Sequence, residues 1–409
     1  MGYCYGTGLH LGWHKLYTDM KVSLFVHDLA GNPIARAIPI AQALGKLGYD
    51  VEILGLLISG DCVFKPYRDA FSYKFLPATA HMNQVLAKAR RLSDLATGDI
   101  IYAFKPLWTS FWPALLASGF GKKKLLLDVE DDEWWMDTRG FFSFFVNNVI
   151  RGWNFSGSLK YKLLLHPFTH FCHQTTVVSR KLRARYGGTI VLHGVDRHLF
   201  NPGRLTLTKD VCRRKFRLPL ESPLVLFAGT PRRHKGISTI VDALMCPAAD
   251  NYTLVLAGNK QDHEFERAAA LLGDRCVLLG LVDHLDMPDL IAAVDVVPTP
   301  QHSNSFTQSQ IPAKLLEAMA MAKPVVVTRV SDLALIVGEN ERNPRGWVIE
   351  PENTDQLANV LKYIYANPGE ARKRGNAARC YFMENACDEV IGCQLQRIID
   401  NCARCVRSS

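Results

Sequence analysis

A single glutamate interrupts an apolar, helix-length run in the second half of the sequence. The run PAKLLEAMAMA begins at Pro312, and Glu317 is its one acidic residue. Pro312 suits the first helical position, where the N–H that proline lacks has no partner, and Ser309 and Gln310 stand where a cap is expected. Pro324 then ends the helix. The N–H groups at the start of such a helix attract an anion, and Glu317 lies near that anion but too far along the helix to act as a cap.

Two interpretations of Glu317 remain open from this run alone. The first is a carboxylate that accepts hydrogen bonds from the sugar hydroxyls of a bound nucleotide. The second is a solvated helix glutamate, which is the commonest situation for this residue type. A second group of chemically suitable residues helps to choose. Arg232, Arg233 and Lys235 occur together in TPRRHKG, directly after the apolar run LVLFAG.

The elements that position these groups are predicted from apolar runs that alternate with helix-length segments. One series of runs begins at Lys21, Asp50, Tyr73, Asp99, Lys124, Thr175 and Thr189, and a second at Pro223, Tyr252, Cys276, Val294, Pro324 and Gly346. Most of these runs are continuously apolar, which is typical of parallel strands covered on both faces. The sequence therefore predicts an α/β protein with two doubly wound, Rossmann-like domains facing each other across a cleft.

The domain boundaries follow from composition. Residues 1–20 read as an N-terminal extension and 21–202 as the first Rossmann-like domain. A polar, proline-bearing stretch at 203–222 is predicted to be the interdomain linker. Residues 223–375 are predicted to form the second Rossmann-like domain, and 376–409 C-terminal helices that pack back toward the first domain.

The strand order places the charged loops together. In open α/β sheets, ligands bind at the carboxyl ends of the strands. The loop with Lys235 and the loop that leads into the Glu317 helix both follow strands of the second domain, so cations and a helix N-terminus are expected to meet at a diphosphate. Glu317 then reaches the ribose.

Four motifs in order resemble the retaining nucleotide-sugar glycosyltransferases of family 4, which have the GT-B fold. The motifs are LHGVDRHLFNP, LVLFAGTPRRHKGISTIVDAL, VLLGLVDHLDMPDLIAAVDVVPTP and IPAKLLEAMAMAKPVVVT. The resemblance runs from Lys21 to about Cys405 and is strongest in the second domain. It implies that Arg232 or Arg233 holds the diphosphate together with Lys235, and that Glu317 binds the ribose.

The resemblance also assigns the remaining donor-binding residues. It implies phosphate binding by backbone N–H groups around Ile311 and Ala313, and it adds Gly229 and Val282 to the donor site. It further implies that no metal and no cofactor are required, because cations and a helix dipole stabilise the diphosphate. The nucleoside-diphosphate sugar is then a co-substrate.

Two positions depart from the family pattern. The family often has two glutamates eight residues apart, and the first of these positions is Ser309, which together with Gln310 is expected to hydrogen-bond the sugar. The glycine-rich loop of the first domain is reduced to DLAGNPIARA, centred on Gly31 and Asn32. This loop either contacts the donor or the acceptor or forms a simple turn between a strand and a helix.

An acidic stretch, LLDVEDDEWW, follows a predicted strand of the first domain. Asp131 or Asp132 is predicted to orient the acceptor hydroxyl or the donor sugar, and both are grouped with Lys235 and Arg232 as catalytic candidates. Clustered carboxylates also raise the possibility of a metal site, which the resemblance argues against. The alternative is a solvated acidic loop.

Charge and hydropathy restrict the partners. The formal net charge is +9, and residues 138–195 carry eight Lys and Arg residues with no Asp or Glu. Interleaved aromatic residues make this span suited to an anionic membrane surface, or else the aromatics are core and the cations line the cleft. A nucleic-acid partner is not expected. Eleven scattered cysteines and the lack of an apolar run of about 18 residues favour a reduced, cytoplasmic location, with peripheral membrane binding as an option.

These observations predict a retaining, metal-independent glycosyltransferase of hexosyltransferase type, which transfers a sugar from a nucleoside diphosphate to an acceptor hydroxyl. The acceptor, whether a glycan, a lipid-linked compound or a small molecule, stays open, as do the base and the sugar. Two alternatives remain. One is an epimerase-like enzyme of the same fold, and the other is a non-catalytic nucleotide-sugar binder.

Overall fold

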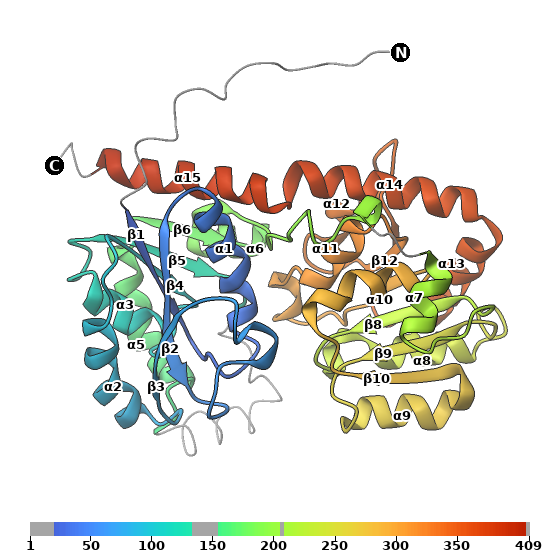
Figure 1. Ribbon diagram of the computed structural model, residues 1–409, viewed down its shortest axis with the longest axis horizontal. Helices are drawn as coiled ribbons and strands as arrows, with labels where there is room; N and C mark the ends of the chain where they lie inside the picture. The colour runs from blue at the N-terminus through green and yellow to red at the C-terminus, as the bar shows by residue number, and fades with distance from the viewer. Residues whose placement is uncertain (1–19, 133–153, 205–207, 406–409) are drawn as a thin grey trace, which may run out of the picture. The chain divides into compact units, whose positions relative to one another are not determined.

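The computed structural model describes residues 20–132, 154–204 and 208–405 (Figure 1). Contacts divide these residues into two compact units. The first unit comprises 20–129, 154–176 and 392–405, and the second comprises 130–132, 177–204 and 208–391. The predicted N-terminal extension and most of the first half of the acid-free span lie outside the described residues.

A seven-stranded sheet organises the first unit, and its last strand (Thr189–Ile190) consists of residues assigned to the second unit. Its strands are β1 (Lys21–Val26), β2 (Asp50–Leu57), β3 (Tyr73–Pro77), β4 (Ile100–Phe104), β5 (Lys124–Val129), β6 (Gln174–Val177) and β7 (Thr189–Ile190). The order is β3-β2-β1-β4-β5-β6-β7, and the pairs from β3 through β5 are parallel. Every residue of β4 is buried, as its apolar sequence predicts. The chain passes into the second unit within β6.

Helices of the first unit follow its strands in the alternating order that the sequence predicts. They are α1 (Ile34–Lys46), α2 (Met82–Asp94), α3 (Phe111–Ala117) and α5 (Leu159–Leu165), with short 3-10 helices η1 (Lys65–Tyr67) and η5 (His166–Phe171). A buried ion pair joins α1 to β5, because Arg36 donates to Asp128 at 2.8 and 3.1 Å. Thr176 also donates to Asp128, at 2.6 Å. Asp128 therefore has a structural role, although it belongs to the acidic stretch.

The second unit contains two three-stranded parallel sheets. Their orders are β10-β9-β8 and β11-β12-β13, with strands β8 (Leu224–Ala228), β9 (Thr253–Ala257), β10 (Cys276–Gly280), β11 (Val297–Thr299), β12 (Val325–Thr328) and β13 (Trp347–Ile349). A parallel bridge between Val225 and Val296 links β8 to the start of β11. The combined order repeats the 3-2-1-4-5-6 winding of the first sheet, which is that of a Rossmann fold.

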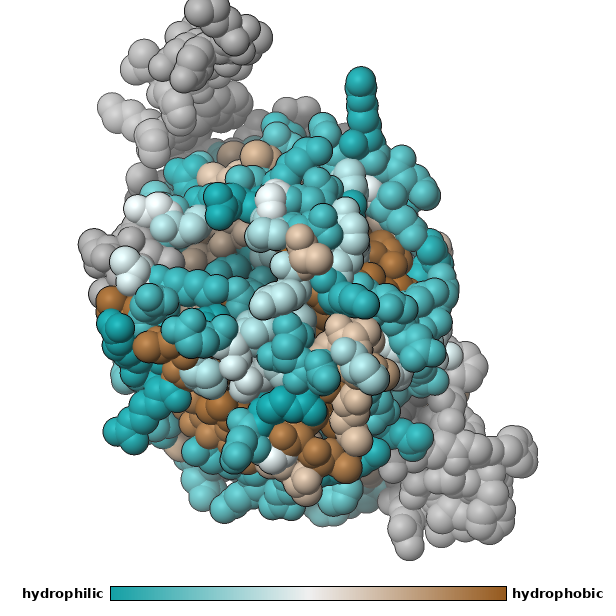
Figure 2. Space-filling view, turned by 90° about the vertical axis from the view of Figure 1, so that its right-hand side faces the viewer, coloured by the Kyte–Doolittle hydropathy of each residue, from teal (hydrophilic) through white to brown (hydrophobic). Residues whose placement is uncertain are grey.

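The following helices begin within the second unit. They are α6 (Arg180–Tyr186), α7 (Lys209–Lys215), α8 (Ile237–Met245), α9 (His263–Leu272), α10 (Met287–Ala293), α11 (Ala313–Ala320), α12 (Leu333–Ile336), α13 (Thr354–Ala366), α14 (Pro368–Asn385) and α15 (Asp388–Cys405). Helices α8 and α9 pack on the core of this unit. Phe227 of β8 is fully buried and packs with Ile240 of α8 and Phe265 of α9. Figure 2 shows a mostly hydrophilic face with hydrophobic residues in patches among the polar ones.

The contacts draw boundaries that differ from those expected from composition. The first unit ends at Thr176 rather than at 202, because the chain from Val177 onward makes most of its contacts within the second unit. The expected linker at 203–222 contains α7, whose buried Arg213 donates to Asp295 at 2.9 Å and to the Ala293 carbonyl at 3.0 Å. That segment is therefore part of the second unit's fold.

The end of the chain belongs to both units. α14 begins at Pro368, earlier than the expected boundary at 376, and α15 passes from the second unit into the first at Gly392. Gly392 packs against Ala43 and Leu47 at the end of α1. Within the described residues, no helix is long and apolar enough to cross a membrane.

Candidate functional site

The cationic loop of the second unit lies between β8 and α8. Gly229 starts it with φ 120°, and the short 3-10 helix η7 (Arg233–Lys235) ends it. Gly236 then adopts the left-handed conformation with φ 73°, and a Cβ atom there would lie 1.9 Å from the Pro300 carbonyl oxygen. Only glycine meets both requirements, so the sequence KG positions the lysine while the loop packs closely against the segment after β11.

Side chains of the cationic loop differ in exposure. Arg232 and Arg233 are exposed, whereas Lys235 is partly buried and its Nζ donates to the Thr230 carbonyl at 2.8 Å. Burial and the neighbouring Arg232 lower the pKa of Lys235 to about 8, while Asp131 opposes the shift. The same loop holds His234, whose pKa falls to about 4 because of burial and the nearby Lys235. The loop therefore gathers positive charge at the carboxyl end of β8, with Asp131 as a nearby carboxylate.

The loop from β11 to α11 lies against the cationic loop. The backbone N–H of His302 donates to the His234 carbonyl at 2.9 Å, and the rings of His234 and Phe306 pack edge to face. A short 3-10 helix, η10 (Thr307–Ser309), precedes α11. The expected cap is not formed, because Pro312 occupies the N-cap position without a side-chain hydrogen bond. Helix α11 begins at Ala313 and Ile311 is buried beneath the turn.

Ser309 is fully buried. Its hydroxyl donates to the Phe306 carbonyl at 2.6 Å and accepts from the backbone N–H of Asp132 at 3.1 Å. With both interactions made inside the protein, the hydroxyl is not positioned to contact a sugar, as the sequence had suggested it would. Ser309 instead joins the acidic segment to the α11 loop.

The two aspartates of the acidic segment have different surroundings, and all the contacts described here fall within the second unit. Gln310 donates its side-chain amide to Asp131 at 2.5 Å. Asp132 is 2% exposed and accepts from Arg185 of α6 at 2.8 and 3.0 Å. Asp132 thus serves mainly to anchor its segment. Asp131 lies close enough to the cationic loop to oppose the lowering of the pKa values of Lys235 and His234.

Glu317 lies on α11 in a partly buried position. Burial raises its pKa to about 7, and Lys314 acts in the opposite direction. The predicted nucleotide-binding carboxylate is therefore shielded from water near the cationic loop. The sequence interpretation missed Lys314, which stands three residues before Glu317 and hence on the same face of the helix. That spacing was the available signal.

Other predicted site residues lie elsewhere. Val282 is partly buried in the loop after β10. Gly31 and Asn32 belong to the first unit, in the turn between β1 and α1, where a Cβ atom on Gly31 would lie 2.9 Å from the Ser59 hydroxyl. This close contact gives Gly31 a structural reason for lacking a side chain. Among the described residues, no group of three or more His, Cys, Asp or Glu side chains is arranged to hold a metal ion.

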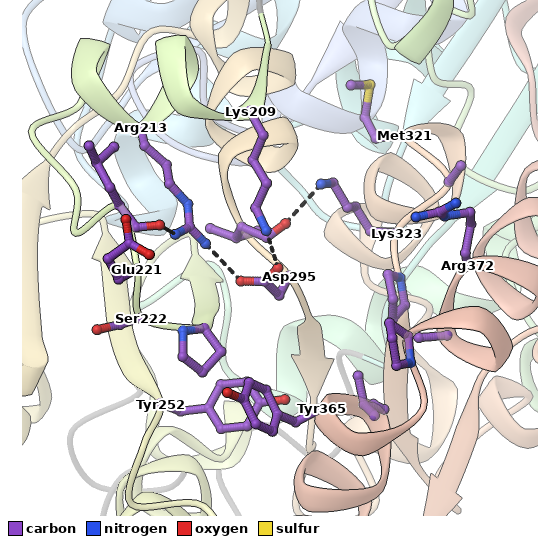
Figure 3. A pocket seen from close by; sticks show the side chains of 18 residues that line it. Lys209, Arg213, Glu221, Ser222, Tyr252, Asp295, Met321, Lys323, Tyr365 and Arg372 are labelled. Carbon is purple, nitrogen blue, oxygen red and sulfur yellow. Dashed lines mark hydrogen bonds and ion pairs between the residues drawn. The ribbon is translucent and has the colours of Figure 1, made fainter.

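A pocket of about 510 Å³ lies at the opposite edge of the second unit's strands (Figure 3). Its lining includes Pro223, Tyr252 and Pro324, which directly precede β8, β9 and β12, and Asp295, which lies two residues before β11. The predicted site residues follow strands rather than precede them, so the pocket contains none of them. The chemistry predicted from sequence therefore belongs to the carboxyl edge of the strands.

The chain is similar in sequence to known glycosyltransferases. Residues 208–380, which include Lys235 and Glu317, match the sequence profile of the family "Glycosyl transferases group 1". The chain is 28% identical over 214 residues to a D-inositol 3-phosphate glycosyltransferase of Xylanimonas cellulosilytica, which covers 50% of this chain and 49% of that protein. It is 27% identical over 183 residues to the lipopolysaccharide core biosynthesis mannosyltransferase LpsB of Rhizobium meliloti, covering 42% and 49%. The chain spans about half the length of these relatives.

Solved structures match over nearly the whole chain. Anabaena HepE, solved with UDP and glucose, has a TM-score of 0.70 at 18% identity and covers 93% of this chain and 99% of its own. A glycosyltransferase from Rickettsia africae has the same TM-score and identity, with coverage of 95% and 99%. The structural likeness shows the fold. The chain therefore has the GT-B fold, and its residues 208–380 match the model of the family "Glycosyl transferases group 1".

Proposed function

We propose that this protein is a retaining glycosyltransferase that moves a sugar from a nucleoside diphosphate to an acceptor hydroxyl. The observation that carries the proposal is the meeting of three groups within the second unit. Lys235 supplies a shielded cation, Glu317 a shielded carboxylate and Asp131 a carboxylate held by Gln310. A diphosphate, a ribose and a sugar are the three parts of the donor that these groups suit. HepE, a structural neighbour, is described with UDP and glucose.

The chemistry requires no nucleophile from the protein. The bond between the sugar C1 and the phosphate oxygen breaks while the acceptor oxygen forms a bond to C1 on the same face. The acceptor proton passes to the leaving phosphate oxygen. Negative charge grows on the diphosphate during this step, and preorganised cations such as Lys235 stabilise it more in the transition state than in the bound donor. A metal ion is then unnecessary, and activity should persist in EDTA.

Asp131 is the residue that we assign to the sugar. The resembled family has a glutamate at the position of Ser309, whose hydroxyl is buried here and bonded to the backbone. Asp131 is attached to the neighbouring Gln310, so its carboxylate lies beside the position where the family pattern places one. We therefore assign orientation of the donor sugar to Asp131, with Gln310 as the residue that positions it.

A donor screen followed by product analysis tests the function. Thermal shifts with UDP-, GDP-, ADP-, CMP- and dTDP-sugars identify the base, since a ligand at 100 times its Kd adds about 2.7 kcal/mol of stability. Proton NMR of the product formed from the bound donor then reports the anomeric configuration. Retention of the donor's configuration supports the proposal. Inversion, or complete loss of turnover in EDTA, contradicts the mechanism.

Ser309 favours one alternative, a nucleotide-sugar binder without turnover. Its buried hydroxyl means that the α11 loop contributes no carboxylate of its own at that position. This alternative predicts binding of a nucleotide sugar with no transfer to any member of a broad acceptor panel and no release of altered sugar. Turnover with any acceptor removes it.

Peripheral membrane binding is a further part of the proposal. On α5, which belongs to the acid-free span, Leu163 and Leu164 are 51% and 60% exposed, and they directly follow Lys162 in the sequence. Exposed leucines next to Lys160 and Lys162 suit the interface of an anionic bilayer. Flotation with phosphatidylglycerol vesicles tests the idea. We expect binding at low salt that is lost in the double variant Leu163→Ser, Leu164→Ser, and wild-type protein that stays unbound would contradict it.

A further inference from the structure

The ammonium group of Lys314 is buried without a hydrogen-bond partner. Its Nζ is shielded from solvent on α11 and lies 3.8 Å from the centre of the Phe227 ring. The ring face attracts a cation, but it supplies less than the three hydrogen bonds that water gives to an exposed ammonium. Burial accordingly lowers the pKa of Lys314 well below its ordinary value. A group left in this state points to a partner that the protein itself does not supply.

Lys323 is a second buried lysine, and its ammonium group has hydrogen-bond partners within the protein. Lys323 follows the same helix and is also shielded, but its Nζ donates to the Ala292 carbonyl at 2.7 Å and to the Val294 carbonyl at 2.8 Å. Figure 3 labels Lys323 and draws one of these two bonds. Two backbone oxygens thus satisfy Lys323, and none satisfies Lys314. Because buried polar groups in proteins are nearly always hydrogen-bonded, the exception at Lys314 requires its own explanation.

The surroundings of Lys314 indicate an anion. Lys235, on the loop after β8, is close enough to lower the pKa of Lys314 further. Glu317 opposes this effect, yet it forms no ion pair with Lys314 among the contacts of the described residues, and its own pKa of about 7 leaves it partly neutral at physiological pH. The first turn of α11 adds the positive end of its dipole. Two lysines and a helix start therefore share one region with Glu317, and Asp131 acts on Lys235 from the acidic segment.

We propose that Lys314 is a donor-binding residue whose ammonium contacts the diphosphate of a nucleotide bound beside Glu317 and Lys235. This inference rests on the proposed function and deepens it. Three residues of helix correspond to about 4.5 Å of rise, so Lys314 lies between Glu317 and the start of the helix. If Glu317 binds the ribose, the adjacent group of the nucleotide along the helix is the phosphate attached to that ribose.

The variant Lys314→Met tests the assignment, because methionine fills similar space and has no charge. The probes are UDP, GDP and ADP, each compared with its nucleoside and with pyrophosphate by isothermal titration calorimetry on the full-length protein. For the nucleotide that the wild type binds, we expect the Kd of the diphosphate to rise by about 10- to 100-fold, the scale for removing a buried charged partner. The Kd of the nucleoside should change less than threefold. Lys314→Arg should recover only part of the affinity.

The Tm of the ligand-free protein is a second readout, because loss of a lysine with a purely structural role would lower it. Without ligand, the Tm of Lys314→Met should equal or exceed that of the wild type, because an unpaired buried ammonium is removed. Lys323→Met is the matched control: it should lower the Tm, since two carbonyls lose their donor, and leave nucleotide affinity unchanged. Lys362→Met, at an exposed position of α13, controls for loss of one charge.

The outcomes separate this inference from the proposed function. If no nucleotide binds the wild type, the proposed function fails and the inference fails with it. If the wild type binds a diphosphate and Lys314→Met binds it equally well, only the inference is overturned. Equal weakening for nucleoside and diphosphate overturns the phosphate assignment, and a Lys314→Met protein that unfolds or loses several degrees of Tm shows that the lysine supports the fold instead.

Discussion

Replacing Glu317 with glutamine should stabilise the protein above neutral pH. Burial raises the pKa of this carboxyl from an ordinary value of 4.5 to about 7. Below pH 4.5 the group is neutral in both the folded and the unfolded chain. Between 4.5 and 7 the unfolded chain loses the proton while the folded protein keeps it, so the free energy of unfolding falls as pH rises through this window. Above pH 7 the full cost of the buried charge is present.

The pKa difference sets the size of the effect. At about 1.36 kcal/mol for each pKa unit, the charged form of Glu317 lowers the free energy of unfolding by at most about 3 kcal/mol. Partial exposure reduces this, so we expect a gain of about 1–2 kcal/mol for Glu317→Gln at pH 8. For a unit of 150–250 residues, this corresponds to a rise in Tm of roughly 2–8 °C. At pH 5 the two proteins should unfold at nearly the same temperature.

Thermal unfolding followed by circular dichroism at pH 5 and pH 8 measures the difference. Glu221→Gln is the matched control, because Glu221 is an exposed glutamate of the same unit, and its Tm should follow that of the wild type at both pH values. Calorimetry on the same samples should show weaker nucleotide binding by Glu317→Gln. Two results would refute the idea that Glu317 is a desolvated carboxylate kept for a ligand. One is a Tm of Glu317→Gln below that of the wild type at pH 8, and the other is an equal difference in Tm between the two proteins at both pH values.

Three further predictions concern Asp131, Asp132 and Lys235. Asp131→Asn should lower kcat by at least tenfold while leaving nucleotide affinity within about twofold, if Asp131 orients the sugar; a kcat equal to that of the wild type would return Asp131 to the role of a solvated loop residue. Asp132→Asn should instead lower the Tm, because Arg185 loses its partner. Since the pKa of Lys235 is lowered to about 8, its ammonium is lost above that pH in the free protein, and nucleotide Kd should rise up to about tenfold between pH 7 and 9.5. Lys235→Arg should show a flat profile over the same range.

Much of the fold could be predicted from the sequence, because continuous apolar runs specify parallel strands directly. The two doubly wound, Rossmann-like domains are confirmed, and the strands of both follow the same winding order. The spacing of Lys235 and Gly236 also predicted a loop at the carboxyl end of β8, and the structure shows why glycine is required there. These features are local: a strand, a turn and a helix start are determined by residues close together in the sequence.

The features that could not be predicted depend on contacts distant in sequence. Ser309 was expected near the sugar, but its hydroxyl is bonded to the Asp132 backbone, which lies 177 residues earlier. The pairing of Gln310 with Asp131 is similarly remote. Lys314 was overlooked because a lysine on a helix is usually solvated, and only packing against Phe227 reveals that its ammonium is buried. Sequence gives the residue types at the site, but burial and partner choice require the fold.

The central claim is that the carboxyl edge of the second unit's strands binds the diphosphate of the donor. Lys235 then stabilises the negative charge that grows on this diphosphate as it leaves. Steady-state kinetics of Lys235→Ala and Glu317→Ala, with the donor identified by the thermal-shift screen, test it most directly. Lys235→Ala should lower kcat by roughly 10²- to 10³-fold with a smaller rise in donor KM, because the cation acts mainly on the transition state. Glu317→Ala should do the reverse, raising donor KM most, since ribose hydroxyls do not change charge during transfer. A folded Lys235→Ala protein with wild-type kcat would contradict the account, because the diphosphate would then lie outside this loop.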